Sequence, residues 1–359
     1  MDKTQYIYDL LNNAQYYFLS RPRRFGKSLL LDTIKEAFEG ERQLFKGLWI
    51  HDSDYDFIKH PVIKLDMSGI SNETPDILKN SLLAALRKRV INEKLDVADD
   101  IPSDLFKHLI EDLYYKYGRE VVVLIDEYDK PILDHLGNNA VAEANRQILR
   151  GFYGILKSMD PYLRFVFITG VSKFTKTSIF SDLNNLMDIT LAKKYSNICG
   201  IAIDDLDKYF GEHIQYLSSI DELKYVKNIR DKILEWYDGY SWDGGARVIN
   251  PYSLISFLEH ERFSGYWFAS GTPRFLMNII KQNPGAYLNL KNLEMTELML
   301  DSADIDRISI EPVLFQAGYL TVKEVIPTGE TPVYVLDIPN NDVREGLNYI
   351  FNREGCTLN

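Results

Sequence analysis

A three-residue run, Gly26-Lys27-Ser28, has the composition of a loop that binds phosphate. It stands between an apolar, aromatic-rich run at residues 16–19 and a helix predicted over residues 29–38, which is the strand–loop–helix context that such a loop requires. The helix N-terminus would offer unpaired N–H groups and about half a positive charge to an anion. Lys27 would reach the β- and γ-phosphates of a nucleotide, and Ser28 would place its hydroxyl on Mg²⁺.

The run departs from the full phosphate-loop pattern at one position. That pattern has a glycine five residues before Gly26, where this chain has Arg21. A non-glycine residue held in a left-handed conformation costs about 1–2 kcal/mol. The loop therefore either follows another path or is a variant stiffened by Pro22. If only Gly26-Lys27-Ser28 is considered, an ordinary helix start beside a solvated run of basic residues explains the sequence as well as a phosphate-binding loop does.

A pair of acids follows a second apolar run. Residues 121–125 are unbroken and mostly β-branched, as in a central parallel strand, and Asp126 and Glu127 come next. Acids at the carboxyl end of a buried strand lie where open α/β sheets bind ligands. Asp126 would hold Mg²⁺ through its water shell, and Glu127 would act as general base on the water that attacks the γ-phosphate. The alternative is that the two acids only cap a helix, but the upstream Gly-Lys-Ser favours the metal-binding and general-base roles.

Two further residues are candidates for phosphate contacts. Thr169 ends the apolar run at 164–169, where it either hydrogen-bonds the γ-phosphate or the attacking water or simply terminates a strand. Arg274 begins a predicted helix, where the helix dipole disfavours a cation. It therefore either serves an external anion or is an exposed arginine.

The order of elements predicts an α/β fold. Strands are expected at 16–19, 62–66, 121–125 and 164–169, with helices at 29–38, 141–159 and from an N-cap at Ser103 to Gly118. Alternating strands and helices indicate a parallel sheet with right-handed crossovers. After about Leu191 the pattern becomes helical. A helix (308–316), two strands (319–325 and 333–336) and a last helix (342–351) then suggest a small winged-helix-like module.

Composition and charge indicate which classes of binding partner the chain is expected to have. The chain has 359 residues, of which 45% are hydrophobic. Its formal net charge is -11, so its surface is expected to repel nucleic acid and anionic lipid overall. Residues 296–359 hold four basic and eleven acidic residues, which makes them a poor phosphate surface and favours a protein partner. Cys199 and Cys356 cannot form a four-ligand zinc site alone. No run is long enough to span a membrane and the N-terminus is unlike a signal peptide, so a cytoplasmic location is expected.

The chain resembles the prokaryotic AAA-ATPase-like family, P-loop proteins of the wider AAA+/STAND type. The matching strings are Asp2-Lys3-Thr4, Tyr17 to Ser28 with its Arg-Pro-Arg-Arg-Phe-Gly-Lys-Ser, Leu124–Pro131 with its Asp-Glu-Tyr-Asp-Lys-Pro, Ile168–Phe174, Asn250-Pro251-Tyr252-Ser253 and Leu314–Thr321. Family members often carry a C-terminal restriction-type nuclease domain. No paired-acid-and-lysine nuclease motif occurs before Asn359, so this sequence is expected to lack that domain.

The resemblance implies a P-loop NTPase three-layer sandwich (residues 1–195), a helical lid region (196–295) and a winged-helix-like module (296–359). It implies ATP and Mg²⁺ as ligands, with the metal on Ser28 and Asp126 and hydrolysis by Glu127. Arg21 in place of glycine is a habit of this group, and Arg274 is similar to the second sensor arginine of AAA+ proteins. The loop expected to surround the nucleotide comprises Arg21, Pro22, Arg23, Arg24, Phe25, Gly26, Lys27, Ser28 and Leu29.

We therefore expect a Mg²⁺-dependent ATP-binding protein that hydrolyses ATP slowly as a nucleotide switch. The alternatives are a nucleotide-binding module that does not hydrolyse and regulates a partner, and a P-loop kinase of small molecules. A DNA-dependent motor is weakened by the acidic C-terminal region. The oligomeric state is left open: related proteins form rings completed by a neighbour's arginine, and Arg146, Arg150 and Arg164 are all candidates for that role.

Overall fold

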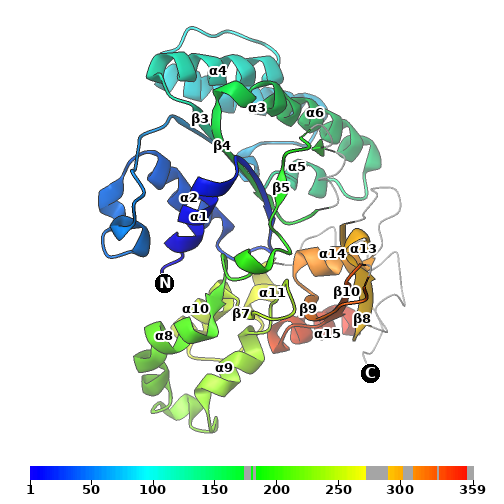
Figure 1. Cartoon of the computed structure of the whole chain (residues 1–359). Helices are drawn as coiled ribbons and strands as arrows, with labels where there is room; N and C mark the ends of the chain where they lie inside the picture. The colour runs from blue at the N-terminus through cyan, green and yellow to red at the C-terminus, as the bar shows by residue number, and fades with distance from the viewer. Residues whose placement is uncertain (174–178, 181–182, 272–289, 302–309, 330, 354–359) are drawn as a thin grey trace.

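The computed structural model describes residues 1–173, 179–180, 183–271, 290–301, 310–329 and 331–353. Its centre is one parallel sheet of five strands in the order β2-β3-β4-β1-β5 (Figure 1). The strands are β1 (Tyr16–Ser20), β2 (Val62–Asp66), β3 (Val121–Asp126), β4 (Leu163–Gly170) and β5 (Met187–Asp188). The predicted parallel α/β sheet is confirmed.

The strand order determines which loops meet. Because all strands are parallel, their carboxyl ends lie at one edge, and β4 stands between β1 and β3. Ser20 at the end of β1 is in register with Gly170 at the end of β4. Asp126 at the end of β3 is in register with Asp66 at the end of β2. The phosphate-loop candidate and the acid pair therefore share one edge of the sheet.

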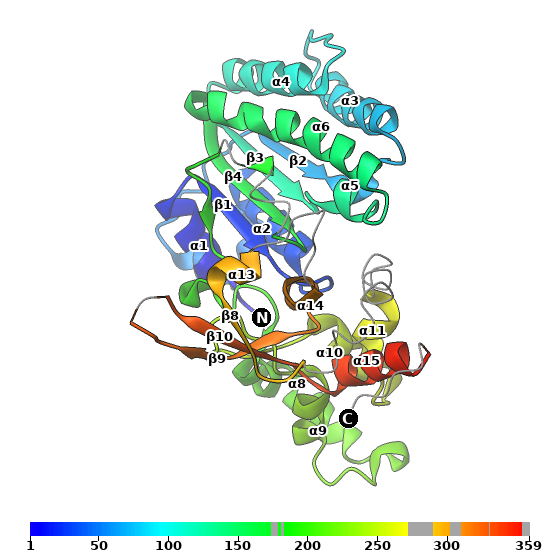
Figure 2. The same ribbon diagram turned by 90° about the vertical axis from the view of Figure 1, so that its right-hand side faces the viewer.

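Helices cover both faces of the sheet (Figure 2). Side chains alternate along each strand, so Tyr17 and Leu19 pack on one face and Tyr16 and Phe18 on the other. The first face is covered by α1 (Thr4–Asn13) and α2 (Lys27–Phe38), and the second by α3 (Pro75–Asn92), α4 (Pro102–Tyr117), α5 (Lys130–Leu133) and α6 (Asn139–Ser158). The result is the three-layer sandwich expected from the sequence.

Two details of the sandwich differ from the sequence prediction. Helix α4 begins at Pro102 with Ile101 as its N-cap, so the prediction of Ser103 as the cap is wrong. Proline suits the first helical position because its missing N–H would have no helical partner there. Helix α3 was not predicted; it follows Thr74, whose hydroxyl accepts the N–H of Ile77.

The region after the sheet is helical, as predicted. It contains α8 (Ile203–Leu217), α9 (Ile229–Tyr237), α10 (Pro251–His260) and α11 (Tyr266–Gly271), with the short strands β6 (Ile201–Ala202) and β7 (Val248–Ile249). These elements share a core of their own, which includes Leu206, Ile233 and Phe257.

The C-terminal part is a small antiparallel sheet with helices. The order of its strands is β8-β10-β9. Its elements are β8 (Leu293–Thr296), α13 (Glu297–Asp301), α14 (Ile310–Ala317), β9 (Thr321–Ile326), β10 (Val333–Asp337) and α15 (Asn341–Arg353). The predicted helix, hairpin and helix are present, and β8 adds a strand that was not predicted. The assignment as a winged-helix module and the boundaries at 195 and 295 stay predictions.

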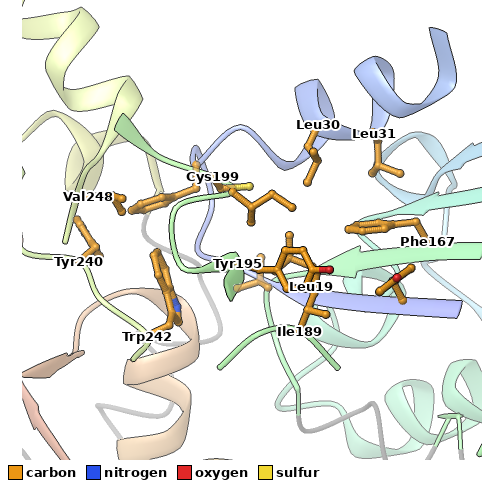
Figure 3. Close-up of a cluster of buried hydrophobic side chains, with 14 of the residues drawn as sticks. Leu19, Leu30, Leu31, Phe167, Ile189, Tyr195, Cys199, Tyr240, Trp242 and Val248 are labelled. Atoms are coloured by element: carbon orange, nitrogen blue, oxygen red, sulfur yellow. The ribbon is translucent and has the colours of Figure 1, made fainter. Parts of the chain in front are cut away.

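One hydrophobic core joins the sheet to the C-terminal part. Figure 3 shows this core from Leu19 and Leu31 through Tyr195 and Cys199 to Tyr240 and Trp242, which precede the C-terminal part. The same core also includes Leu314 of α14 and Leu336 of β10. The loop between β1 and α2 lies where these segments meet, so residues from far along the chain pack against it. In the described residues, no helix is long and apolar enough to cross a membrane.

Candidate functional site

The loop between β1 and α2 presents an open helix N-terminus. Gly26 is the N-cap of α2 and has a φ of 89°, a left-handed conformation that suits glycine. A Cβ atom added at Gly26 would meet no atom of the described residues within 4 Å, so the space beside its α-carbon is open with respect to them. Glycine has no side chain to cap the N–H groups of the first turn of α2, and no cap hydrogen bond is present there among the described residues. These N–H groups are available to an anion.

Lys27 lies over the loop that precedes it. Its side chain is 5% exposed, and Nζ donates to the carbonyl oxygen of Pro22 at 3.2 Å. Within the described part of the chain, no carboxylate forms a salt bridge with this ammonium group. A phosphate in the loop would be a stronger, charge-assisted acceptor than the neutral carbonyl, so Lys27 fits the role of a phosphate ligand.

Ser28 and Asp126 meet across the sheet edge. The Ser28 hydroxyl donates to Oδ2 of Asp126 at 2.5 Å, and the backbone N–H of Glu127 donates to Oδ1 at 2.9 Å. Burial raises the pKa of Asp126, and the Ser28 hydrogen bond and the Lys27 charge partly offset this rise. A desolvated carboxylate beside a hydroxyl is an oxygen pair suited to Mg²⁺, which keeps several waters. The two residues therefore fit the predicted metal.

A metal at this place would depend on few protein ligands. Among the described residues, no group of three or more His, Cys, Asp or Glu side chains is arranged to hold a metal ion. Ser28 would supply an oxygen ligand and Asp126 would hold the metal through its water shell, so phosphate oxygens and water would have to supply the rest. This is the usual arrangement for Mg²⁺ in phosphate-transfer sites.

Glu127 lines a cavity at the same edge. The cavity has a volume of about 400 Å³ and is also lined by Arg23, Arg24, Ser68 and Lys130. Glu127 has a φ of 53°, an uncommon conformation for a non-glycine residue. Glu127 thus links the cavity to Asp126, its neighbour in the chain, while Lys27, Ser28 and Asp126 themselves do not line the cavity. Ser68, which follows β2, was not predicted as a site residue.

Thr169 is buried at the end of β4, and its hydroxyl donates to the carbonyl oxygen of Leu19 at 2.7 Å. The hydroxyl proton therefore ties β4 to β1, while the oxygen keeps acceptor capacity. A contact between Thr169 and the γ-phosphate stays a prediction. Arg274 lies outside the described residues, so its predicted role also stays a prediction.

Arg21 is buried beneath the loop, where it hydrogen-bonds to backbone carbonyl groups, and it does not line the cavity. Its guanidinium is fully buried, and it donates to the carbonyl oxygens of Ser20, Thr190 and Tyr195. It also lies over the ring of Trp242 at 3.8 Å. Burial lowers the pKa of Arg21 to about 10. The side chain predicted to contact the nucleotide is thus occupied by the protein's own carbonyl groups.

Three other loop residues have separate environments. Phe25 is buried and packs edge-on against Tyr240, with ring centroids 4.7 Å apart. Pro22 lies against Gly318, where an added Cβ would come within 2.7 Å of it. Leu29, on the first turn of α2, is 71% exposed and offers an apolar surface beside the loop.

Sequence reasoning missed a buried acid three residues after Asp126. Asp129 is fully buried, and its Oδ2 accepts hydrogen bonds from the backbone N–H and the hydroxyl of Ser172 at 2.6 and 2.5 Å. A Cβ atom on Gly170 would lie 2.5 Å from Oδ1 of Asp129, so this close approach requires glycine. Asp129 thereby ties the segment after β3 to the segment after β4. Its place within Asp-Glu-Tyr-Asp was the only sequence signal.

Lys173 continues this connection toward the C-terminal part. Its side chain is 3% exposed and forms ion pairs with Asp188 at 3.0 Å and with Asp301 of α13. Its backbone N–H donates to Oε1 of Gln316 at 2.8 Å. The edge of the sheet that carries the candidate site is therefore attached to two helices of the C-terminal part.

Comparison with known proteins gives a family match and distant structural likenesses. Residues 1–180 match the model of the AAA-ATPase-like family, described as predicted AAA-ATPase. A protein of Azotobacter chroococcum mcd 1, described as an uncharacterized protein in the vnfD 5′ region, is 39% identical over 351 residues, which cover 97% of this chain. The chain spans 65% of the length of that curated relative.

Two solved structures are similar at low identity. The Aeropyrum pernix ORC2 protein, in ADPNP–ADP complexes, has a TM-score of 0.36 at 10% identity, with 98% of this chain and 93% of that chain covered. Drosophila ORC bound to poly(dA/dT) DNA and Cdc6 has a TM-score of 0.32 at 11% identity, with 78% of this chain and 42% of that chain covered. Likenesses this remote carry no argument about ligands.

Proposed function

This chain belongs to the predicted AAA-ATPase family, and we propose that it binds ATP with Mg²⁺ at the loop between β1 and α2, hydrolyses it slowly and acts as a nucleotide switch. One observation carries the proposal: the Ser28 hydroxyl donates to Asp126 at 2.5 Å. These residues come from different parts of the sheet edge, and their contact supports the proposal because it brings the N-terminus of α2, which we propose binds phosphate, next to the carboxylate that we propose binds the metal.

Each residue of the site has a chemical role in this proposal. The N–H groups at the start of α2 and the Lys27 ammonium bind the phosphates. Ser28 and Asp126 orient Mg²⁺, which when bound neutralises charge on the β- and γ-phosphate oxygens. Leu29, exposed on the first turn, packs against the non-phosphate part of the nucleotide.

Hydrolysis requires a base at the γ-phosphate, and we propose Glu127 for this role because it lines a cavity and follows Asp126 directly. The attacking water transfers one proton to the Glu127 carboxylate while its oxygen bonds to the γ-phosphorus. The bond from that phosphorus to the β–γ bridging oxygen breaks, and its electron pair leaves on ADP. Inorganic phosphate and ADP are the products.

The contacts of the loop with distant parts of the chain support the proposed switch role. The indole N–H of Trp267 on α11 donates to the carbonyl oxygen of Arg23 at 3.1 Å, and Phe25 packs against Tyr240. A nucleotide that moves the loop would change these contacts. We propose that the helical and C-terminal parts convey this change to a protein partner.

The test is calorimetric titration with ATP, ADP and GTP, with and without Mg²⁺, together with an assay of phosphate release. Lys27→Ala should weaken ATP binding by about 1.5–3 kcal/mol, because it removes a charge-assisted contact. Unchanged affinity in Lys27→Ala would refute the proposed site. Glu127→Gln should keep ATP binding and abolish turnover, since a neutral amide cannot take the proton.

The same assays decide between the alternatives. ATP binding by the unaltered chain without phosphate release would favour a regulatory module that does not hydrolyse. ADP production only after a small-molecule acceptor is added would favour a kinase.

A further inference from the structure

We infer that Arg24 is a catalytic cation that acts on the γ-phosphate bound by its own chain, with Tyr252 of α10 as its positioning residue. The inference rests on the proposed ATPase function and deepens it. It assigns to the phosphate-binding loop itself a charge that related enzymes can obtain from a neighbouring chain.

The first observation is the backbone of Arg24. It has a φ of 68°, in the left-handed region where glycine is at ease and an arginine is strained. Of the six non-glycine residues with positive φ in the described ranges, two line one cavity, Arg24 and Glu127. Strained residues that gather at one cavity mark a functional site, because a glycine would adopt the same backbone without strain. Arg24 therefore occupies this position for its side chain.

The second observation is that the charge of Arg24 has no acidic partner among the residues that the structure describes. No salt bridge to Arg24 occurs within the described residues, whereas Lys130, another cation of the cavity, is paired with Asp134 at 2.6 Å. The Arg24 guanidinium instead lies over the ring of Tyr252 at 4.3 Å. An aromatic ring holds a guanidinium in place and leaves its hydrogen-bond donors free, so Arg24 keeps its charge for a ligand.

Tyr252 is itself held firmly. Asn250 caps α10, and its side-chain oxygen accepts the N–H groups of Tyr252 and Ser253 at 2.9 and 3.1 Å. The Ser253 hydroxyl donates to buried Asp342 at 2.7 Å. The Asn-Pro-Tyr-Ser string is thus a rigid base that presents a ring to the loop. A shift of α10 would carry the Arg24 guanidinium toward or away from the cavity.

Two arginines considered for this role from the sequence are engaged elsewhere. Arg146 forms a salt bridge with Glu143, and Arg164 donates to the carbonyl oxygen of Leu11 at 2.9 Å. Neither lines the cavity with Glu127, whereas Arg24 does. The loop thereby supplies its own candidate.

The chemical role follows from where charge develops. As the bond between the γ-phosphorus and the bridging oxygen breaks, negative charge is spread over the γ-phosphate oxygens and the leaving oxygen. Guanidinium donors directed at those oxygens stabilise the transition state more than bound ATP. Arg24 should therefore matter little for ATP affinity and strongly for turnover.

The decisive variant is Arg24→Gly, because glycine suits the φ of 68° and the fold should be retained. We expect ATP affinity within a few-fold of the unaltered chain and phosphate release lowered about 10³-fold. A second readout needs no turnover: calorimetry should show that ADP with aluminium fluoride, a mimic of the transferring phosphoryl group, loses its affinity advantage over ADP alone. Lys94→Gly is the matched control, since exposed Lys94 has a φ of 53° and does not line the cavity.

Tyr252 is tested by ring retention. Tyr252→Phe keeps the ring and should keep most of the turnover, whereas Tyr252→Ala should lower turnover and leave ATP affinity nearly unchanged. Equal losses in both variants would contradict the positioning role.

A mixing experiment separates action in cis from action in trans. In a mixture of Arg24→Gly and Glu127→Gln chains, every site lacks one essential group if Arg24 serves its own chain, so phosphate release stays low. Recovery of phosphate release on mixing would overturn the inference. Full phosphate release by Arg24→Gly would also overturn it, as would a result in which Arg23→Ala loses phosphate release and Arg24→Gly does not. An unaltered chain that binds ATP without hydrolysing it would also overturn the inference but leave the binding site standing. No ATP binding at all would overturn both proposals.

Discussion

The indole N–H of Trp267 donates to the backbone carbonyl oxygen of Arg23 at 3.1 Å, although 244 positions separate the two residues in the chain. The indole ring is almost fully buried and packs against Tyr319, with ring centroids 5.0 Å apart. One hydrogen bond thus joins the middle of the phosphate-loop candidate to α11. The conformation of the loop and the position of α11 are therefore coupled.

Replacing Trp267 tests this coupling. Trp267→Phe removes the hydrogen bond and keeps an aromatic ring, so we expect a stability loss of about 1 kcal/mol from the bond, plus the cost of the smaller ring. Urea unfolding measures this loss. ATP should change the tryptophan fluorescence of the unaltered chain, and Trp267→Phe should lose much of that change. An undiminished change would place the reporting tryptophan elsewhere.

Asp126→Asn tests the metal role. The amide keeps the size of the side chain and removes the negative charge that would attract Mg²⁺. ATP affinity measured with Mg²⁺ should fall about 10- to 100-fold, the equivalent of a lost charge-assisted contact. Affinity measured in EDTA should change little. An equal fall in both conditions would mean that Asp126 shapes the loop and does not bind metal.

Lys173→Met tests the attachment of the C-terminal part to the sheet. The change leaves Asp188 and Asp301 without their shared cation, and removing one partner of a buried ion pair costs about 3–5 kcal/mol. Because the two carboxylates are 20% and 30% exposed, we expect a smaller loss, about 2 kcal/mol. Limited proteolysis should then cleave the C-terminal part sooner. A variant with Asp188→Asn and Asp301→Asn added to Lys173→Met should recover part of the stability.

The stability of the protein should depend on pH through Asp342. Burial raises the pKa of Asp342 to about 6. Hydrogen bonds from Ser253 and from the backbone N–H groups of Trp267 and Phe268 lower this pKa, but burial has the larger effect. The ordinary value is 3.8, so between about pH 4 and 6 the folded chain binds this proton more tightly than the unfolded chain. The free energy of unfolding should therefore fall as pH rises through this window, by up to about 3 kcal/mol.

Asp342→Asn isolates that contribution, because asparagine does not titrate. Urea unfolding at several pH values should show a flatter dependence for the variant between pH 4 and 6 than for the unaltered chain. Parallel curves would assign the dependence to other buried acids, among them Asp126, Asp129 and Asp238, whose pKa values burial also raises.

Local patterns in the sequence were sufficient for much of the fold. The strand at 62–66 has the predicted bounds, and the helix predicted over 29–38 begins two residues earlier, at Lys27. The periodicity of apolar residues, unbroken apolar runs and turn residues are signals that extend over only a few positions. These signals are therefore enough to predict where strands and helices form. The same local signals placed Ser28 at the start of the helix that follows one strand and Asp126 directly after another strand, and parallel strands bring their carboxyl ends to one edge.

Only the tertiary structure decided how the site residues are used. Arg21 and Arg24 belong to one basic run, yet Arg21 is buried among carbonyl groups and Arg24 lies over Tyr252 at a cavity. The helix N-cap at Ile101, the added strand β8 and the bond between Trp267 and Arg23 were equally invisible. Each depends on which distant segments pack together, because a side chain's partners are set by long-range burial and hydrogen bonding that no neighbouring residue encodes.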